Sequence, residues 1–181
     1  MQQEAQQKQW FVLRDLKRSN AINPAYIQLP QLGFEVFTPL KTKIVSIAGK
    51  PQRKEVPFIQ DLLFVFTSRD FLDPVINKTN TLQYRYVKGA PQGTPLTVRA
   101  NDMARFIHAV TTLGTPKYYS PEEITPDMCR RRIRLHCNGP LDNLEGYLLT
   151  VKGSSKKRIL VELAGLLTAA VKIQPQYIEL I

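Results

Sequence analysis

The sequence predicts an α+β fold in two parts, and three observations support this prediction. The first 112 of its 181 residues mix strand-like runs with amphipathic helical segments. A stretch rich in proline, threonine and serine, 113–127, comes next and is typical of a linker. The remaining segment, 128–181, holds five short apolar runs separated by turn residues. Such runs favour a small β-barrel, because closing the sheet removes its exposed edges.

Four strands are expected in the N-terminal part, as an antiparallel sheet with helices packed against it. The run PFIQDLLFVF, which ends at Phe66, is almost continuously apolar and predicts a strand buried on both faces in mid-sheet. Its alternation places Leu62, Phe64 and Phe66 on one face and Leu63 and Val65 on the other. The other strand-like runs are 10–16, 34–40 and 82–89.

Two segments of this part are typical of helices. Between Asn101, a suitable N-cap, and Gly114, a suitable stop, apolar residues recur at helical spacing. A second helix is expected to begin at Pro24, because an Asn-Pro pair suits a helix start. Pro30 would cost about 3 kcal/mol inside a helix. The second helix is therefore expected to end or break near residue 29.

Composition and charge narrow the classes of function. No apolar stretch approaches the roughly 18 residues of a membrane span, and the first ten residues lack the core of a signal peptide. We therefore expect a cytoplasmic monomer with no membrane partner. Cys129 and Cys137 fit neither a disulfide scaffold nor a zinc site, so no metal or cofactor is expected. The net charge of +10 favours anionic partners such as nucleic acid, although a solvated lysine-rich surface is the alternative.

Glycines mark the C-terminal part. In NGPLDNLEGYLLTVKG, Gly139 and Gly153 stand where turns need a positive φ. Gly146 falls inside an expected strand, where glycine marks a bulge or a close approach of two backbones. The five expected strands span residues 132–137, 144–152, 157–163, 167–173 and 176–181.

Taken in order, these pieces resemble the NusG family of transcription elongation factors. The stretch NGPLDNLEGYLLTVKGSSKKRILVEL is similar to the KOW motif through Gly139, Pro140 and Gly146. The runs WFVL, GFEVFTPL and PFIQDLLFVF, in that order, are similar to the NusG N-terminal (NGN) domain. The UpxY-type antiterminators of Bacteroidetes, which serve polysaccharide operons, are the most similar branch. The resemblance implies an NGN domain at 1–112, a linker at 113–127 and a five-stranded KOW barrel at 128–181.

The resemblance implies binding without catalysis. The NGN domain would dock on the clamp helices of RNA polymerase and suppress pausing or termination. The matching positions here are Arg14, Ile59, Leu62 and Phe64. The chain departs from the family at 59–62, where Ile-Gln-Asp-Leu replaces the usual Phe-Pro-Gly-Tyr. A core position is an equal alternative for Phe64, whereas the polar neighbours of Ile59 favour the surface.

Basic residues would make a second contact, with non-template DNA or nascent RNA. Lys17 and Arg18 match a basic patch that family members direct at DNA, where charge gives affinity without sequence information. The segment KTKIVSIAGKPQRK is expected to form a hairpin tip that reaches DNA, with a solvated loop as the alternative. Its basic residues are Lys41, Lys43, Lys50, Arg53 and Lys54.

Other classes of function stay open at this point. KOW barrels also occur in ribosomal proteins, so an RNA-binding or ribosome-associated protein is the alternative. The basic runs 130–134 and 156–158 flank the expected barrel, and RNA, the ribosome, the polymerase or another factor is their expected partner. An enzyme is not expected, because the catalytic motifs are missing. His108 is expected to pack or to lie at the surface of the apolar-striped helix, and His136 has no obvious acid partner. The stretch LVELAGLLTAAV suits helix as well as strand, which leaves a change of fold open.

Overall fold

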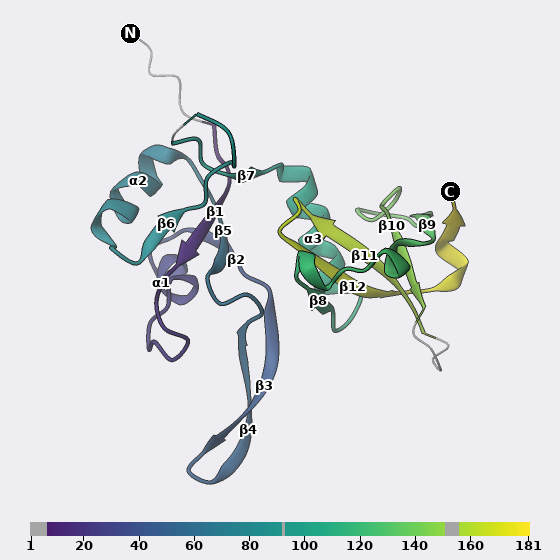
Figure 1. The fold of residues 1–181 in the computed structure, drawn as a ribbon, viewed down its shortest axis with the longest axis horizontal. Helices are drawn as coiled ribbons and strands as arrows, with labels where there is room; N and C mark the ends of the chain where they lie inside the picture. Colours follow the sequence, from purple (N-terminus) through teal and green to yellow (C-terminus); the bar gives the residue numbers. More distant parts are fainter. Residues whose placement is uncertain (1–6, 92, 151–155) are drawn as a thin grey trace. The chain divides into compact units, whose positions relative to one another are not determined.

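The computed structural model describes residues 7–91, 93–150 and 156–181 (Figure 1). It shows a mixed α+β architecture with antiparallel sheets, and three α-helices lie within the described residues. The contacts divide the chain into two units, Met1–Arg99 and Ala100–Ile181. None of the helices in the described part of the chain is long and apolar enough to span a bilayer.

The sheet of the first unit is built around β1 (Gln9–Asp15) and β5 (Leu62–Thr67). Its strand order is β2-β5-β1-β6, with β2 at Glu35–Phe37 and β6 at Leu82–Tyr84, and β7 (Thr97–Val98) also pairs with β1. All of these pairings are antiparallel. The prediction that β5 is a buried inner strand is confirmed, because β5 lies between β2 and β1 and five of its six residues are buried. The strand begins only at Leu62, because a turn precedes it.

Two helices, α1 (Ala25–Gln31) and α2 (Arg69–Lys78), pack with one face of this sheet. The buried residues of this core are Phe11, Leu13, Ala25, Leu29, Leu63, Val65, Leu72, Leu82 and Tyr84. Leu63 and Val65 belong to this core, as their alternation along β5 predicted. The opposite face of the sheet carries aromatic pairs, Trp10 with Phe66 and Phe37 with Phe64, whose ring centroids lie 5.4 and 6.1 Å apart.

The start of α1 is held by a buried carboxylate from the end of β1. Asp15 accepts hydrogen bonds from the backbone N–H of Ala25, at 2.6 Å, and of Lys17, at 3.1 Å. The helix does not stop at residue 29 but includes Pro30 and ends at Gln31. Pro30 is tolerated because only the last turn of a short helix is affected, and Gly33 then takes a positive φ of 86°.

Helix α2 was not predicted from the sequence. Its interior contains Pro74, which argues against a helix in any reading based on propensity. Asp70 in its first turn and Lys78 in its last turn complement the helix dipole, and Leu72 is buried. Packing against the sheet therefore outweighs the cost of the proline.

The expected hairpin is confirmed as an element of its own. β3 (Leu40–Ile47) and β4 (Lys50–Pro57) form a two-stranded antiparallel sheet that extends away from the sheet of the first unit in Figure 1. Ala48 and Gly49 connect the strands with positive φ angles of 50° and 78°. Two successive positive φ values match the right-handed twist of the strands and allow a tight reversal.

The second unit contains a six-stranded sheet of order β13-β9-β10-β11-β12-β8. The five expected strands are all present, and β11 and β12 have the predicted bounds. Their ranges are β9 (Arg132–Leu135), β10 (Glu145–Thr150), β11 (Lys157–Leu163), β12 (Leu167–Ile173) and β13 (Ile178–Leu180). The expectation of a closed five-stranded barrel needs correction, because a sixth strand, β8 (Lys117–Tyr119), pairs with β12 and the two end strands of this order do not pair in the described residues.

The boundary between the units also differs from the one expected at 112–128. Helix α3 (Ala100–Thr112) contacts β11 and β12 and is grouped with the second unit. The expected linker 113–127 supplies β8 and the short 3-10 helix Pro121–Glu123, and it leads into a second one, Pro126–Cys129, that contacts β10. The apolar stripe of α3 was visible in the sequence, but the surface against which it packs was not.

Two of the three motif glycines have the backbone roles that were predicted. Gly139 has a φ of 109°, as a turn requires. A side chain at Gly146 would place its Cβ 2.3 Å from the carbonyl oxygen of Leu160 and 2.8 Å from a side-chain carbon of Ile159. Strands β10 and β11 therefore approach so closely that only glycine fits at residue 146. Gly153 lies outside the described residues.

We expect Gly146→Ala to lower the free energy of unfolding of the second unit by about 1–3 kcal/mol, because overpacking against a backbone oxygen forces the strand to move. Chemical denaturation of the whole chain measures this change. Thr150→Ala, at an exposed position of the same strand, should change the free energy by less than about 0.5 kcal/mol. Equal effects of the two substitutions would contradict the close approach.

A fragment of residues 100–181 should unfold cooperatively, whereas a fragment of residues 128–181 should melt at much lower temperature or lack a transition. The shorter fragment loses α3, with its four buried side chains, and β8. Burial of each large apolar side chain contributes about 1.5–3 kcal/mol, against a typical total of about 5–15 kcal/mol for a domain. Circular dichroism melts of both fragments test this. Indistinguishable melts would show that the second unit begins at residue 128, as the sequence predicted.

Candidate nucleic-acid interface

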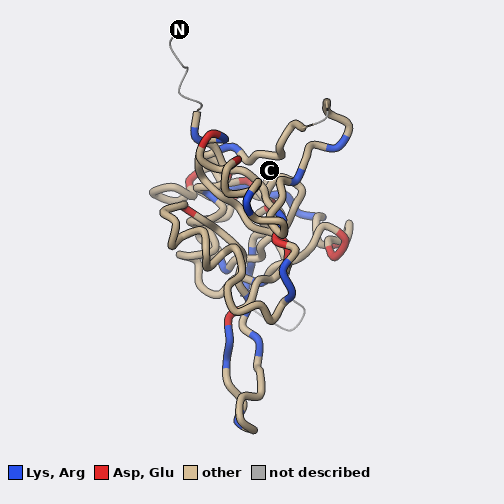
Figure 2. The backbone as a smooth tube through the Cα atoms, turned by 90° about the vertical axis from the view of Figure 1, so that its left-hand side faces the viewer, with Lys and Arg blue, Asp and Glu red and all other residues tan. Residues whose placement is uncertain are grey.

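The pairing register of the β3–β4 hairpin determines which face each of its basic residues occupies. Residues that pair across the hairpin lie on the same face, and the face alternates along each strand. Lys43 pairs with Lys54, Ile47 with Lys50 and Lys41 with Val56, so one face carries four lysines and no acidic residue. We call this surface, formed by Lys41, Lys43, Lys50 and Lys54 with the intervening Val45, Ile47, Gln52 and Val56, the lysine face. Figure 2 shows the basic residues along both strands and at the tip of the hairpin.

The opposite face of the hairpin has a different composition. Thr42 pairs with Glu55 and Ile44 with Arg53, so this face combines one acidic and one basic residue. Arg53, which the sequence grouped with Lys50 and Lys54 as one DNA-binding set, is therefore separated from them by the pleat. Alternation along β4 alone separates Arg53 from Lys50 and Lys54. Which residues of β3 share a face with each of them follows from the pairing of the two strands.

The direct pairing of Lys43 with Lys54 is unfavourable for the isolated hairpin. Like charges opposite each other in an antiparallel pair destabilise it by up to about 1 kcal/mol. Both side chains are exposed, and no hydrogen bond or ion pair of either with a described carboxylate accompanies the pairing. An anion bound at this face would relieve the repulsion, which makes the lysine face suited to a polyanion.

The hairpin has almost no core of its own. All residues from Lys41 to Glu55 are exposed except the half-buried Val45. Ile44 and Ile47 are 70% and 49% exposed. At its base, the ammonium of Lys41 lies 5.1 Å from the centre of the Phe58 ring, and the N–H of Phe58 donates to the carbonyl of Pro39 at 2.7 Å. The hairpin is thus anchored at one end and open to solvent along both faces.

Lys17 and Arg18 have different environments despite their adjacency. The ammonium of Lys17 donates to the carbonyl of Asn23 at 2.7 Å and to the side chain of Gln28 at 3.2 Å. These bonds tie the loop after β1 to α1, so Lys17 serves the fold of the first unit. Arg18 is exposed. Of the predicted pair, Arg18 is therefore the more exposed side chain.

Asp61 joins two arginines at the edge of the same unit. Its carboxylate accepts from Nε of Arg14 at 3.0 Å and from Nη2 of Arg85 at 3.1 Å. Arg14, expected at the polymerase contact, thus has a charged partner and stays about half exposed. The Nε of Arg85 is buried and has no hydrogen-bond partner among the described residues. Asp61 is one of the residues 59–62 at which the chain differs from the NusG pattern, and its carboxylate holds two arginine side chains.

The remaining predicted polymerase contacts divide between surface and core. Ile59 lies in the turn before β5 and is partly exposed. Leu62 and Phe64 are only 2% and 0% exposed, so in this structure they are core residues. The alternative that the sequence left open for Phe64 is the one seen here. Ile59 and Arg14 are therefore the accessible members of the predicted set.

Three of the four arginines in the run 130–134 are paired with acids. Glu145 accepts from Arg132 at 2.6 Å and from Arg134 at 2.7 Å, and Arg130 bonds to Asp127 at 2.6 Å. The hydrogen bond from Arg134 lowers the pKa of the Glu145 carboxyl, which keeps it charged. The basic run 130–134 therefore offers phosphate less free charge than its sequence indicates.

His136 has an acid partner after all. Its Nε2 lies 2.7 Å from a carboxylate oxygen of Glu179, which β13 brings beside β9. The two residues are 43 positions apart, so only the strand order of the folded sheet brings them together. Both side chains are exposed, and the pair forms part of the surface ion network around Arg134.

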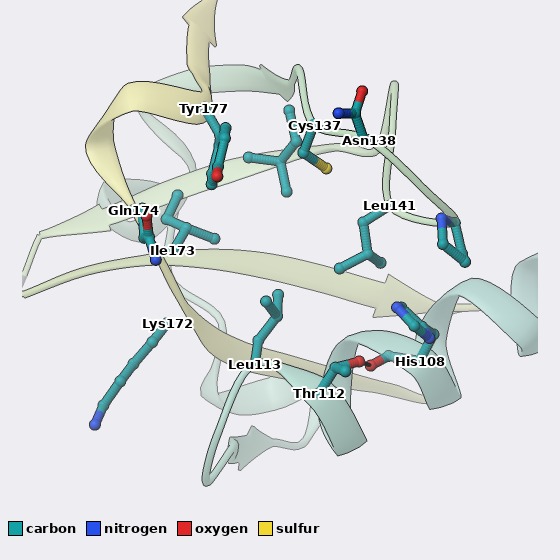
Figure 3. Close-up of a pocket in the computed structure, with 12 residues that line it drawn as sticks. His108, Thr112, Leu113, Cys137, Asn138, Leu141, Lys172, Ile173, Gln174 and Tyr177 are labelled. Atoms are coloured by element: carbon teal, nitrogen blue, oxygen red, sulfur yellow. Dashed lines mark hydrogen bonds between the residues drawn. The ribbon is translucent and has the colours of Figure 1, made fainter.

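A cavity of about 660 Å³ lies in the second unit (Figure 3). Its apolar lining consists of Leu113, Leu135, Leu141 and Ile173. Burial, with a smaller effect of Asp142, raises the pKa of the Cys137 thiol, which is thus held in its neutral form at the cavity wall. The side chain of Lys172 extends away from the cavity in Figure 3. The described lining contains His108 and Lys172 and no Asp or Glu.

A comparison of the chain with models of known protein families finds no match. A comparison with curated proteins finds no match either. The similarity to NusG therefore rests on the residues quoted above and on the order in which they occur.

We expect Lys43→Glu to protect the amides of β3 and β4 from hydrogen exchange, because it replaces a repulsive cross-strand pair with an attractive one worth up to about 1 kcal/mol. Thr42→Glu is the matched control, since it places a second carboxylate opposite Glu55 and should reduce protection. Both effects should shrink at 1 M salt, where the Debye length is about 3 Å. Equal protection in the two variants would contradict the register.

Proposed function

We propose that the chain is a non-catalytic, cytoplasmic transcription factor that binds RNA polymerase through its first unit and holds nucleic acid with the β3–β4 hairpin, promoting antitermination or pause suppression. The observation that carries this proposal is the lysine face. It gathers four exposed lysines on one face of a hairpin, and of these Lys41 also contacts the Phe58 ring at the base. A surface of this kind binds phosphates without reading sequence.

The polymerase part of the proposal is supported by the resemblance to NusG and by two accessible positions. Ile59 is partly exposed in a turn, and Arg14 is about half exposed and paired with Asp61, two residues after Ile59 in the sequence. A groove or ridge on a partner helix would remove Ile59 from water and leave the arginine at the rim. The specialisation for particular operons, such as those for polysaccharide synthesis, is part of the same proposal.

An RNA-binding or ribosome-associated protein is the second candidate, based on the KOW-like strands of the second unit. The pairing of Arg132 and Arg134 with Glu145 weighs against it, because a carboxylate between two arginines reduces the attraction for phosphate. The lysine face has no such neutralising acid. Binding of the whole chain to ribosomes, measured beside binding to polymerase, separates the two candidates.

The proposal is tested with Ile59→Asp in the whole chain. A carboxylate at a partly exposed turn costs little in the free protein, but losing its water in a complex costs several kcal/mol. At 1.4 kcal/mol per tenfold, about 3 kcal/mol weakens polymerase binding more than a hundredfold. Binding to purified polymerase and pausing in a transcription assay are the measurements.

Ile22→Asp serves as the control, because Ile22 is a fully exposed isoleucine of the same unit. We expect it to bind polymerase as the unchanged chain does. Thermal melts establish that both variants are folded. A folded Ile59→Asp chain with full affinity would remove the docking site from this turn, and absence of binding by the unchanged chain would refute the proposed function.

A further inference from the structure

We propose that the β3–β4 hairpin inserts into the major groove of a B-form DNA duplex, with its lysine face turned toward the DNA. This inference rests on the proposed function and deepens it by naming the form of nucleic acid. The described hairpin pairs with no third strand, so it is a free two-stranded ribbon. The major groove of B-DNA is about 12 Å wide and admits such a ribbon, whereas the minor groove, at about 6 Å, does not.

The dimensions of the hairpin suit this groove. Each strand has eight residues, which at about 3.4 Å per residue gives a ribbon about 27 Å long. The turn at Ala48 and Gly49 adds no large side chain at the tip. The hairpin therefore reaches the groove without a change in the sheet from which it extends.

Single-stranded nucleic acid is a poorer match. Proteins that hold single strands combine positive charge with aromatic side chains on which the bases stack. The sequence from Lys41 to Val56, KTKIVSIAGKPQRKEV, contains no aromatic residue. The hairpin thus supplies charge without a stacking surface. Charge alone is enough for contact with the phosphates of a duplex, whose bases are already stacked on one another.

Double-stranded RNA is disfavoured for a geometric reason. The major groove of A-form RNA is deep and narrow, and its minor groove is wide and shallow. The deep, narrow groove leaves too little width for a two-stranded ribbon, and the shallow groove would not enclose it. Ile47 lies on the lysine face, beside the tip, and is 49% exposed. At the floor of a B-form major groove it would meet thymine methyl groups, which accept apolar contacts.

The register divides the hairpin into a binding face and a control face. Lys43 and Lys54 lie on the lysine face, whereas Arg53 lies on the opposite face with Glu55. Loss of two phosphate contacts should reduce the slope of log affinity against log salt by about 1.8, since each contact contributes about 0.9. Between 50 and 200 mM salt, four contacts make binding fall roughly a hundredfold, and two contacts roughly tenfold.

The experiment measures binding of the whole chain to fluorescent 20-base-pair probes by anisotropy over a series of salt concentrations. The probes are a DNA duplex, an RNA duplex of the same sequence and one DNA strand alone. The chain should bind the DNA duplex at least tenfold more tightly than either of the others. The double variant Lys43→Gln, Lys54→Gln should lose about half of the salt slope, and Arg53→Gln should keep it. Thermal melts establish that the variants are folded.

A second pair of probes locates the groove. A duplex with glucosylated 5-hydroxymethylcytosine in place of cytosine has its major groove filled, and we expect at least tenfold weaker binding to it. Netropsin, which fills the minor groove, should leave binding unchanged. Equal affinity for the glucosylated duplex, preference for RNA or single strands, or equal effects of Arg53→Gln and the double variant would each overturn the inference.

Polymerase binding without DNA is measured in parallel. This measurement separates failure of the proposed insertion into the major groove from failure of the proposed function. Loss of groove binding with intact polymerase binding refutes only the mode of DNA contact. Groove binding in a chain that does not bind polymerase refutes the proposed function and leaves the hairpin as a duplex-binding ribbon.

Discussion

The antiparallel pairing of β5 with β1 and β2 is the interaction on which the first unit depends. It presents one face to α1 and α2 and stacks aromatic rings on the other. The hairpin is the connection between β2 and β5, two strands that are neighbours in the sheet. Because those strands are fixed side by side, the chain between them must leave the sheet and return to the same place. A projecting ribbon with a rigid base is the result.

Much of this fold could be predicted from the order of apolar runs and turn residues. The alternation in β5 and the five strands of the second unit follow from local pattern alone, as does the hairpin around Gly49. Helix α2 could not be predicted, because Pro74 opposes a helix locally and the packing of Leu72, Val75 and Ile76 against the core compensates for it. The strand β8 and the packing of α3 depend on contacts with β11 and β12, which no local pattern contains.

The candidate site was predictable in composition but not in geometry. Charge along the sequence identified the basic residues of the hairpin, yet the placement of Lys43 on the same face as Lys54 follows from the register. Lys17 is adjacent to Arg18 in sequence, but its ammonium is used by the loop before α1. Other contacts join residues that are far apart in the sequence and could not be predicted from it. Asp61 pairs with Arg14 and Arg85, and Glu179 lies beside His136.

The scarcity of buried residues in the hairpin has a consequence for how such proteins diversify. Substitutions between Lys41 and Glu55 change charge and shape at the surface without removing atoms from a packed interior. Selection on stability therefore places few limits on this segment, while the β2–β5 pairing preserves its position. The ribbon can therefore change in charge and shape while the scaffold that carries it stays the same.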